Sequence, residues 1–355
     1  MTRNELEALV QSGEIISRVD ASGMDLSGAD LSGGIFEEVR LRDSRLAGAS
    51  FMESMLTNCD LAGADLEEAN LRNATMYKCA LTGARAARAK LAGAKLVDGD
   101  CAAADLAGAD LTYAVFTQCN LEGVCLSRSR LDRTALIDSK TAGLDLSGTV
   151  LRQVTLLKAD LTASNLEGTT FDQAILIDAR LAGRSLRGMS LARSQLMNAD
   201  LTGCDLREAD LTGCNFKDAK LGEARLDGAR ADNALFVGAK LARASLARAS
   251  LEQAVFMDSD LTGADLSGAD MQQAILQKAL CAGARFVNAD LTYADLSHAD
   301  LTSADLSGAK LFRTKLHRIK GEGTRFTDRA AALGDDPELA EAEDFQPPPL
   351  GAATR

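Results

Sequence analysis

Large apolar residues recur at every fifth position along most of this chain. Between Ala21 and Leu316 this position is reached sixty times without an insertion or deletion, and it holds Leu, Phe or Met fifty-four times. The residue two places before it is Ala, Ser, Thr, Cys or Gly in fifty-two of the sixty blocks. Asp or Asn often lies between the two, and Gly often ends the block, as in the sequence ADLSG at 264–268.

A period of five fits neither an α-helix, with 3.6 residues per turn, nor a β-strand, with its alternation of two. A chain that turns a corner every five residues instead brings the small and the large apolar residue of each block inside. Four such sides close a coil of about twenty residues, and coils stack through backbone hydrogen bonds about 4.8 Å apart. The pattern therefore predicts an all-β solenoid of about 15 coils, roughly 70 Å long.

The repeats at 64–66 (ADL) and 264–268 (ADLSG) resemble those of the pentapeptide-repeat proteins, whose motif is A(D/N)LXX. The resemblance covers residues 21–316 and implies a right-handed quadrilateral parallel β-helix in a bacterial protein. The segment 25–33 is also similar to pentapeptide-repeat proteins associated with type VI secretion tip components. Function does not follow from the resemblance, because one fold serves unrelated roles.

The repeat divides the chain into three segments. Residues 1–20 are predicted to form an N-terminal capping helix and a lead-in, and residues 21–326 the β-helix. Residues 327–355 are predicted to form an acidic C-terminal helical segment and a disordered, proline-rich tail.

Both ends of such a solenoid expose unpaired backbone, so we expect short helices to cap them. At the N-terminus, Thr2 and Glu5 have the spacing of a capping box, and Gly13 ends the helix. At the C-terminus, the dipeptide at 336–337 (Asp-Pro) begins a second short helix.

An uninterrupted register assigns each residue to one of four faces. One face has every twentieth residue from 21 to 261 at its centre, and thirteen of the twenty-six positions that flank these centres are charged. Another face has every twentieth residue from 36 to 276 at its centre, and of its twenty-six flanking positions only Glu37, Lys95 and Lys217 are charged. The apolar members of these flanks form what we call the apolar strip: Ile35, Met55, Tyr77, Val97, Val115, Ile137, Leu157, Ile175, Ile177, Met197, Leu235, Val237, Val255, Met257 and Ile275.

Polar residues border this strip. The position after each outward flank, often Gly on other faces, forms what we call the polar rim: Glu38, Asn58, Lys78, Asp98, Gln118, Asp138, Lys158, Asp178, Asn198, Asp218, Asp258 and Lys278. An apolar surface with a polar rim is typical of protein-binding sites. Alternatively, β-branched residues strengthen strand pairing on this face. The Met and Leu members favour recognition, since they gain little from strand geometry.

The net charge is −12. Residues 321–355 hold eight acidic and three basic residues, a net charge of −5, and residues 1–20 hold four acidic and two basic residues, a net charge of −2. The solenoid between them therefore has a net charge of only −5. This balance argues against direct nucleic-acid binding, which needs a basic face. No apolar run is long enough for a membrane span, and charges occupy the place of a signal peptide. We therefore expect a cytoplasmic protein without a nucleic-acid or membrane partner.

Catalytic, cofactor and metal sites are not predicted. Seven of the eight cysteines occupy inward positions, where they act as small hydrophobes, and Cys125 alone points outward. His298 and His317 fall at neighbouring outward positions on adjacent coils, where a two-histidine site is conceivable but exposed surface histidines are the simpler interpretation. Arg184 occupies a small inward position, with the oversized Met189 next to it. An Arg at this position predicts either a kink or buried polar site with a functional role, or a local bulge that lets the Arg184 side chain reach water.

These features favour a non-enzymatic scaffold or adaptor that binds a protein partner, or a second copy of itself, along the apolar strip. The alternative is a DNA-mimicking inhibitor or protector of DNA gyrase or another topoisomerase, as in the fluoroquinolone-resistance members of the resembled family. Mimicry of DNA requires a dense negative surface, which the balanced solenoid does not offer. A carrier for a secreted effector is a third interpretation, which no residue distinguishes.

Overall fold

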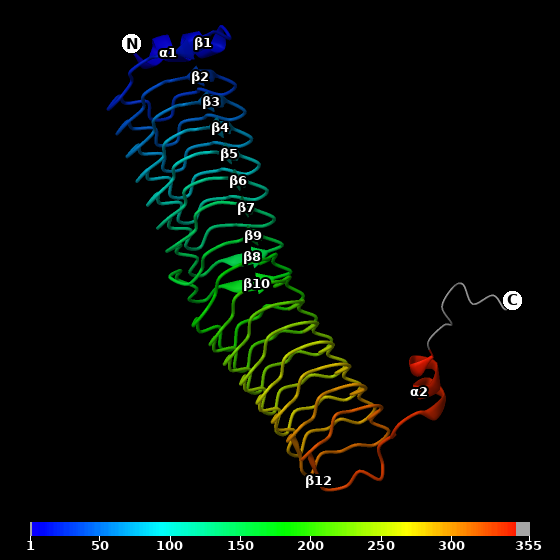
Figure 1. Cartoon of the computed structure of the whole chain (residues 1–355). Coiled ribbons are helices and arrows are strands. Elements are labelled where there is room, and N and C mark those ends of the chain that lie inside the picture. Colours follow the sequence, from blue (N-terminus) through cyan, green and yellow to red (C-terminus); the bar gives the residue numbers. More distant parts are fainter. Residues whose placement is uncertain (1, 346–355) are drawn as a thin grey trace, which may run out of the picture.

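The computed structural model describes residues 2–345, which form a long rod of stacked coils (Figure 1). The rod is a quadrilateral parallel β-helix of about 16 turns. Helix α1 (Arg3–Gln11) lies at one end, and α2 (Pro337–Asp344) lies beside the other. The strands are β1 (Ile15–Ser17), β2 (Ile35–Glu37), β3 (Met55–Thr57), β4 (Thr75–Tyr77), β5 (Lys95–Val97), β6 (Val115–Thr117), β7 (Ala135–Ile137), β8 (Val150–Arg152), β9 (Thr155–Leu157), β10 (Thr170–Asp172), β11 (Asp305–Leu306) and β12 (Arg325–Phe326).

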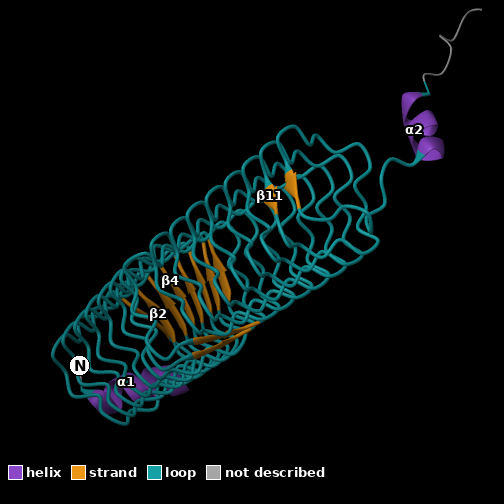
Figure 2. Ribbon diagram, turned by 90° about the horizontal axis from the view of Figure 1, so that it is seen from below, coloured by secondary structure: helices purple, strands orange, loops and turns teal. Residues whose placement is uncertain are grey.

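Each coil pairs with the next in parallel at an offset of twenty residues, except at the last bridge, Lys315↔Leu333. Eight strands form one sheet in the order β1-β2-β3-β4-β5-β6-β7-β9, and Figure 2 shows these strands side by side on one face. On the other faces, and in most of the C-terminal half, single bridges such as Asp200↔Lys220 keep the same offset. The predicted register is thus confirmed, although the β-helix begins earlier than expected, because β1 already pairs with β2 inside the predicted lead-in.

The core is a continuous column of one large and one small side chain per side. Within the repeat ADLSG, both Ala264 and Leu266 are completely buried. Phe216, Phe236 and Phe256 lie in successive coils with their rings stacked, at centroid distances of 5.0 and 4.7 Å. Two large rows would not fit in so narrow a tube, which explains why the residue two places before each large residue is small.

The Asp residues of the motif hold the corners. The Asp65 carboxylate accepts a hydrogen bond from the Glu67 N–H at 3.2 Å, and Asp265 accepts one from the Ser267 N–H at 3.0 Å. This side-chain turn satisfies a backbone donor that points away from the ladder, a role that Asp and Asn perform well. The preference for Asp or Asn at this position therefore has a structural cause.

Helix α1 covers the N-terminal opening, as predicted. The Thr2 side chain and Glu5 form the expected capping box, and Leu6 and Val10 are buried against the first coil. The Arg3 guanidinium donates to the Ser27 carbonyl at 2.7 Å, which anchors the helix to the coil edge.

The C-terminal end differs from the expected helical cap. Strand β12 pairs with β11 and continues the register to Phe326, and the Leu316 N–H donates to the Leu333 carbonyl at 2.8 Å. This last, irregular coil closes the rod. Helix α2 exists where the sequence predicts it, with Asp336 as its N-cap, but it stands beside the last coils (Figures 1 and 2) and is joined to them by side-chain contacts of His298, His317 and Arg318. The predicted proline-rich tail, residues 346–355, lies outside the described residues.

The ladder is interrupted beside Arg184. No bridge joins Asn165 to Ser185 or Thr170 to Ser190, although the structure describes all four residues. The Arg184 guanidinium donates instead to the Ser164 carbonyl at 2.6 Å and to the Thr162 carbonyl at 3.2 Å. Its Nε is buried without a partner, and a cleft of about 620 Å³ opens at the break. The half-buried Arg184 is therefore a local bulge that replaces backbone pairing with side-chain bonds.

We predict that Arg184→Ala stabilises the protein. Alanine is the usual residue of this position, and it allows the Ser185 N–H to reach the Ser164 carbonyl that the guanidinium now occupies. Removal of a buried, unpaired N–H raises the free energy of unfolding by about 1–3 kcal/mol, measured by urea denaturation. Arg193→Ala, at an exposed position of the same coil, serves as the control and changes it by less than about 0.5 kcal/mol. A lower midpoint for Arg184→Ala would contradict this interpretation of the bulge.

Stability is also predicted to fall in acid. Hydrogen bonds from Thr162 hold the pKa of Asp160 below its usual value, and those from Ser307 do the same for Asp305. A carboxyl whose pKa is lower in the folded state contributes stability above its unfolded pKa of about 4 and loses it as the pH falls. The urea midpoint should therefore be flat above about pH 5 and decrease towards pH 2.

The variant Asp160→Asn/Asp305→Asn tests this cause, because Asn keeps the acceptor of the turn but does not titrate. We expect the midpoint of this variant to change less between pH 5 and pH 2 than that of the wild type. An equal change in both proteins would assign the acid sensitivity to other groups.

Candidate protein-binding surface

The apolar strip lies on the face that carries the eight-stranded sheet. Its members follow two columns, one before and one after the buried centre of each side, and Ile15 of β1 extends the first column by one coil. Ile35, Met55, Tyr77 and Leu235 are exposed, with 36–51% of their surface accessible. The other strip residues are half-buried, because each is flanked by the coils above and below it. The structure thus places every predicted strip residue at the surface of one face.

Strand geometry does not account for the whole strip. The strands of this face end at Leu157, the last residue of β9. Beyond it, Ile175, Val255 and their neighbours in the first column pair only through single bridges, yet the column remains largely apolar. In the second column, Ile177 and Met257 lie in turns, where β-sheet propensity gives no advantage. The alternative of plain strand propensity therefore explains only the N-terminal part.

The polar rim occupies the next position of each corner. All of its residues have positive φ, from 47° at Asp138 to 59° at Lys278. Asn, Asp and Gly are favoured at positive φ, whereas Glu, Gln and Lys are not. Some rim residues form ion pairs between adjacent coils, as Lys158 does with Asp138 at 3.1 Å. The rim therefore carries fixed charges along the edge of the strip.

Charged columns on the other faces neutralise each other. Arg45 pairs with Asp25 and Arg180 with Asp160, each at 2.9 Å and each across one coil. Lys310 and Asp290 make a similar pair at 2.9 Å. Because the offset of twenty residues brings opposite charges together, the rod offers alternating charge and not a uniformly negative surface.

Seven of the eight cysteines are buried at inward positions, as predicted, and Cys125 is half-buried. Cys204 and Cys214 are buried, and burial raises the pKa of their thiols to about 11 and about 12. Cys125 is half-buried and is the most accessible of the eight. Thiolate formation is thus disfavoured at Cys204 and Cys214.

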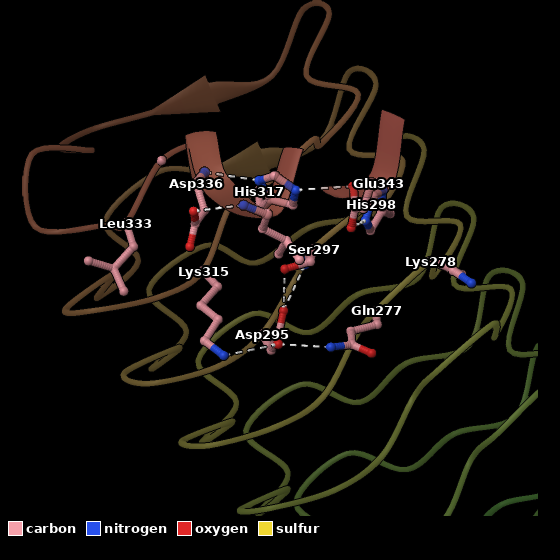
Figure 3. A pocket seen from close by; sticks show the side chains of 12 residues that line it. Gln277, Lys278, Asp295, Ser297, His298, Lys315, His317, Leu333, Asp336 and Glu343 are labelled. Carbon is pink, nitrogen blue, oxygen red and sulfur yellow. Dashed lines mark hydrogen bonds and ion pairs between the residues drawn. The ribbon is translucent and has the colours of Figure 1, made fainter. Parts of the chain in front are cut away.

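The strip ends at Ile275, and the same face becomes polar in the last coils. Asp295, Ser297, Lys315 and His317 occupy the flanks there, around a cavity of about 440 Å³ that α2 borders (Figure 3). The Lys315 ammonium and the Gln277 amide both contact the Asp295 carboxylate, at 3.6 and 2.9 Å. The chain's own C-terminal segment thus lies over the polar end of the face.

Helix α2 is held by three side chains of the rod. The Arg318 guanidinium donates to the Ala340 carbonyl at 2.9 Å and to the Asp344 carboxylate at 2.6 Å. Nε2 of His298 lies 3.0 Å from Oε1 of Glu343, and Nε2 of His317 lies 3.3 Å from Oε2. The expectation of two exposed histidines is therefore wrong for His317, which is only 3% accessible.

Glu343 and Arg318 were not identified from the sequence. The register places His298 and His317 on one face, but nothing in it indicates that a helix after the last coil turns back onto that face. The available signal was an acidic helix in the same chain as a pair of neighbouring histidines.

Family models for pentapeptide repeats match most of the chain. One model, described as pentapeptide repeats in eight copies, matches nine stretches that together cover residues 35–168, 214–277 and 279–318. A second model, a pentapeptide repeat region, matches residues 158–231. The chain belongs to the pentapeptide-repeat family. Neither helix that the structure describes in this pentapeptide-repeat protein is both long and apolar enough to cross a lipid bilayer.

Pentapeptide-repeat proteins are among the similar solved structures. HetL from the cyanobacterium Nostoc sp. strain PCC 7120, involved in heterocyst differentiation regulation, is 25% identical over 72% of this chain and 91% of its own, with a TM-score of 0.24. QnrB1, a plasmid-mediated fluoroquinolone resistance protein, is 17% identical over 60% of this chain and 89% of its own, with a TM-score of 0.27. At these TM-scores neither likeness bears on function. A comparison with curated protein sequences gives no match.

We predict that Arg318→Ala loosens α2 without unfolding the rod. Although solvent screens these partly exposed bonds, Arg318 is, among the described residues, the only group that holds α2 through two of them, so their loss should speed amide exchange in residues 337–344 several-fold. Hydrogen exchange with mass spectrometry measures this. Arg313→Ala, an exposed Arg of the preceding side, is the control and should leave exchange in α2 unchanged. Equal exchange in both variants would show that Arg318 does not hold the helix.

Proposed function

We propose that this pentapeptide-repeat protein is a non-enzymatic scaffold or adaptor that binds a protein partner, or a second copy of itself, along the apolar strip. The observation that carries the proposal is the continuation of the strip beyond the strands. Apolar side chains that lie in turns, such as Ile177 and Met257, gain nothing from strand pairing. Their partial exposure costs free energy in the isolated rod, and contact with a partner removes that cost.

The partial burial of the strip sets the size of the contact. Complete burial of a large apolar side chain contributes about 1.5–3 kcal/mol, and most strip residues have already lost much of their accessible surface. Association itself costs at least about 4 kcal/mol. A partner must therefore cover several successive coils, which favours an elongated contact over a single pocket.

The polar rim supports selectivity. Rim charges such as Asp138 and Lys158 pair between coils and are held in place by the corner geometry. Charges at the edge of an apolar contact influence the rate and the orientation of association more than its final strength. The rim is therefore suited to select the register of a partner along the rod.

No observation favours the topoisomerase alternative. A DNA mimic needs unpaired negative charge along its surface, whereas Arg45 and Arg180 neutralise carboxylates of the adjacent coils. The net charge of −12 includes the terminal segments, so it overstates the charge of the rod.

The proposal predicts that Ile177→Lys/Val255→Lys weakens partner binding at least about tenfold. An exposed Lys costs the free rod little, but its desolvation in a contact costs several kcal/mol. Binding is measured by quantitative pull-down from a lysate of the native host, with mass spectrometry, and self-association by sedimentation of the purified protein.

The matched control is Ala182→Lys/Ala242→Lys, which places two Lys residues at half-buried flanks of another face. Circular dichroism first verifies that both variants remain folded. A partner or a dimer that is lost only with the strip variant supports the proposal. If the strip variant still binds the partner, or if both variants lose it equally, the strip is not the binding surface. A topoisomerase subunit that both variants retain would support the DNA-mimic alternative.

A further inference from the structure

Three metal-ligating side chains meet where α2 lies against the rod. His298 and His317 come from the corners of two successive coils, and Glu343 comes from the last turn of α2. Their ligand atoms all lie within 4.8 Å of one another. Figure 3 shows both imidazole rings beside the Glu343 carboxylate at the edge of the cavity. We propose that these three residues bind a zinc ion, and that the ion clasps α2 to the side of the β-helix.

The ligand set suits zinc better than other common divalent ions. Two imidazole nitrogens and one carboxylate oxygen are typical of zinc sites with three protein ligands and one water. Magnesium and calcium prefer sets made of oxygen atoms. The cavity of about 440 Å³ beside the cluster gives a water molecule access to the fourth position. The site therefore meets the chemical requirements without any change of chain path.

The spacing of the ligands is close to that of a zinc site. Bond lengths of about 2.0–2.1 Å place the corners of a zinc tetrahedron roughly 3.3 Å apart. Nε2 of His298 and Nε2 of His317 lie 3.0 and 3.3 Å from the Glu343 carboxylate oxygens. The two rings are perpendicular, with centroids 5.5 Å apart, and their Nε2 atoms contact different oxygens of Glu343, so binding of one ion requires His298 to rotate towards the other two ligands. His298 has room for this, since its side chain is 32% accessible.

His317 needs a change of tautomer. Its Nδ1 accepts a hydrogen bond from the Asp336 N–H at 3.0 Å, so in neutral His317 the proton resides on Nε2 and points to Glu343. Coordination through Nε2 moves that proton to Nδ1. The Asp335 carboxylate, 3.9 Å from Nδ1, is the nearby acceptor, and ligating histidines usually donate to such a group. Zinc would thus exchange the bond to Asp336 for one to Asp335, immediately before α2.

Charge around the cluster is mixed: Lys278 and Lys315 also line the cavity, and Lys315 is paired with Asp295. Asp335, Asp336 and Asp344 lie on or beside α2, whereas Arg318 is the basic group in contact with Glu343, at 3.3 Å. Arg318 also binds Asp344, so it can keep that bond when zinc takes the Glu343 oxygen. The ion would then connect three side chains that ordinary hydrogen bonds now connect in pairs. This inference does not depend on the function of the apolar strip.

The test is zinc titration of the full-length, tag-free protein. Affinity and stoichiometry are measured by competition with a chromophoric chelator, in a Cys125→Ser background that removes the most accessible thiol. We expect one zinc per chain. His298→Ala and Glu343→Gln should each lower the affinity at least about tenfold, since even groups behind the ligands contribute 10–100-fold. Both positions are partly or fully accessible, so these variants should fold, which circular dichroism verifies.

Glu338→Gln, at an exposed position of the same helix, is the matched control and should bind zinc as the wild type does. Hydrogen exchange provides an independent readout, because zinc should increase the protection of residues 337–344 in the wild type and not in His298→Ala. Stoichiometry well below one, or unchanged affinity in His298→Ala and Glu343→Gln, would overturn the proposal. Zinc that binds at these residues but leaves the exchange of α2 unchanged would overturn the clasp.

Discussion

The narrow interior of the coil is the constraint on which the rest of this structure depends. Each side of the tube admits one large and one small side chain, and the coils hydrogen-bond to each other through their backbones. An insertion of one residue would turn a core side chain outward on every later side, so the period of five is kept across the whole rod. Where the small position is enlarged, at Arg184, the ladder opens instead of the interior expanding.

The fixed register turns the sequence into columns. Residues twenty apart lie next to each other, so opposite charges at that spacing form pairs between coils, as Arg180 and Asp160 do. Apolar residues at the same spacing form a strip, and polar residues after them form its rim. The geometry that builds the core thus also fixes the positions of the surface columns. It does not fix which residues occupy each column.

The C-terminal segment breaks this regularity on the face of the strip. The flanks become polar after Ile275, and α2 lies over them through Arg318, His298 and His317. Within the part of the chain that the structure describes, the short helix is thus held at one end of the apolar face by polar side-chain contacts alone. The ligands of the proposed zinc site lie at that junction, so an ion there would determine how firmly the helix is attached.

How much of this protein was predictable depends on the range of the interactions. The coil, its register, the buried Leu and Ala rows, the capping box at Thr2 and the place of the strip all followed from the sequence, because a period of five fixes each residue relative to its neighbours one coil away. Even the start of α2 at Asp336-Pro337 followed from local turn chemistry. The position of α2 against His317, and the role of Glu343 there, did not. They depend on the path of the chain after the repeat ends, where no register applies and only packing and hydrogen bonds in three dimensions decide the contact.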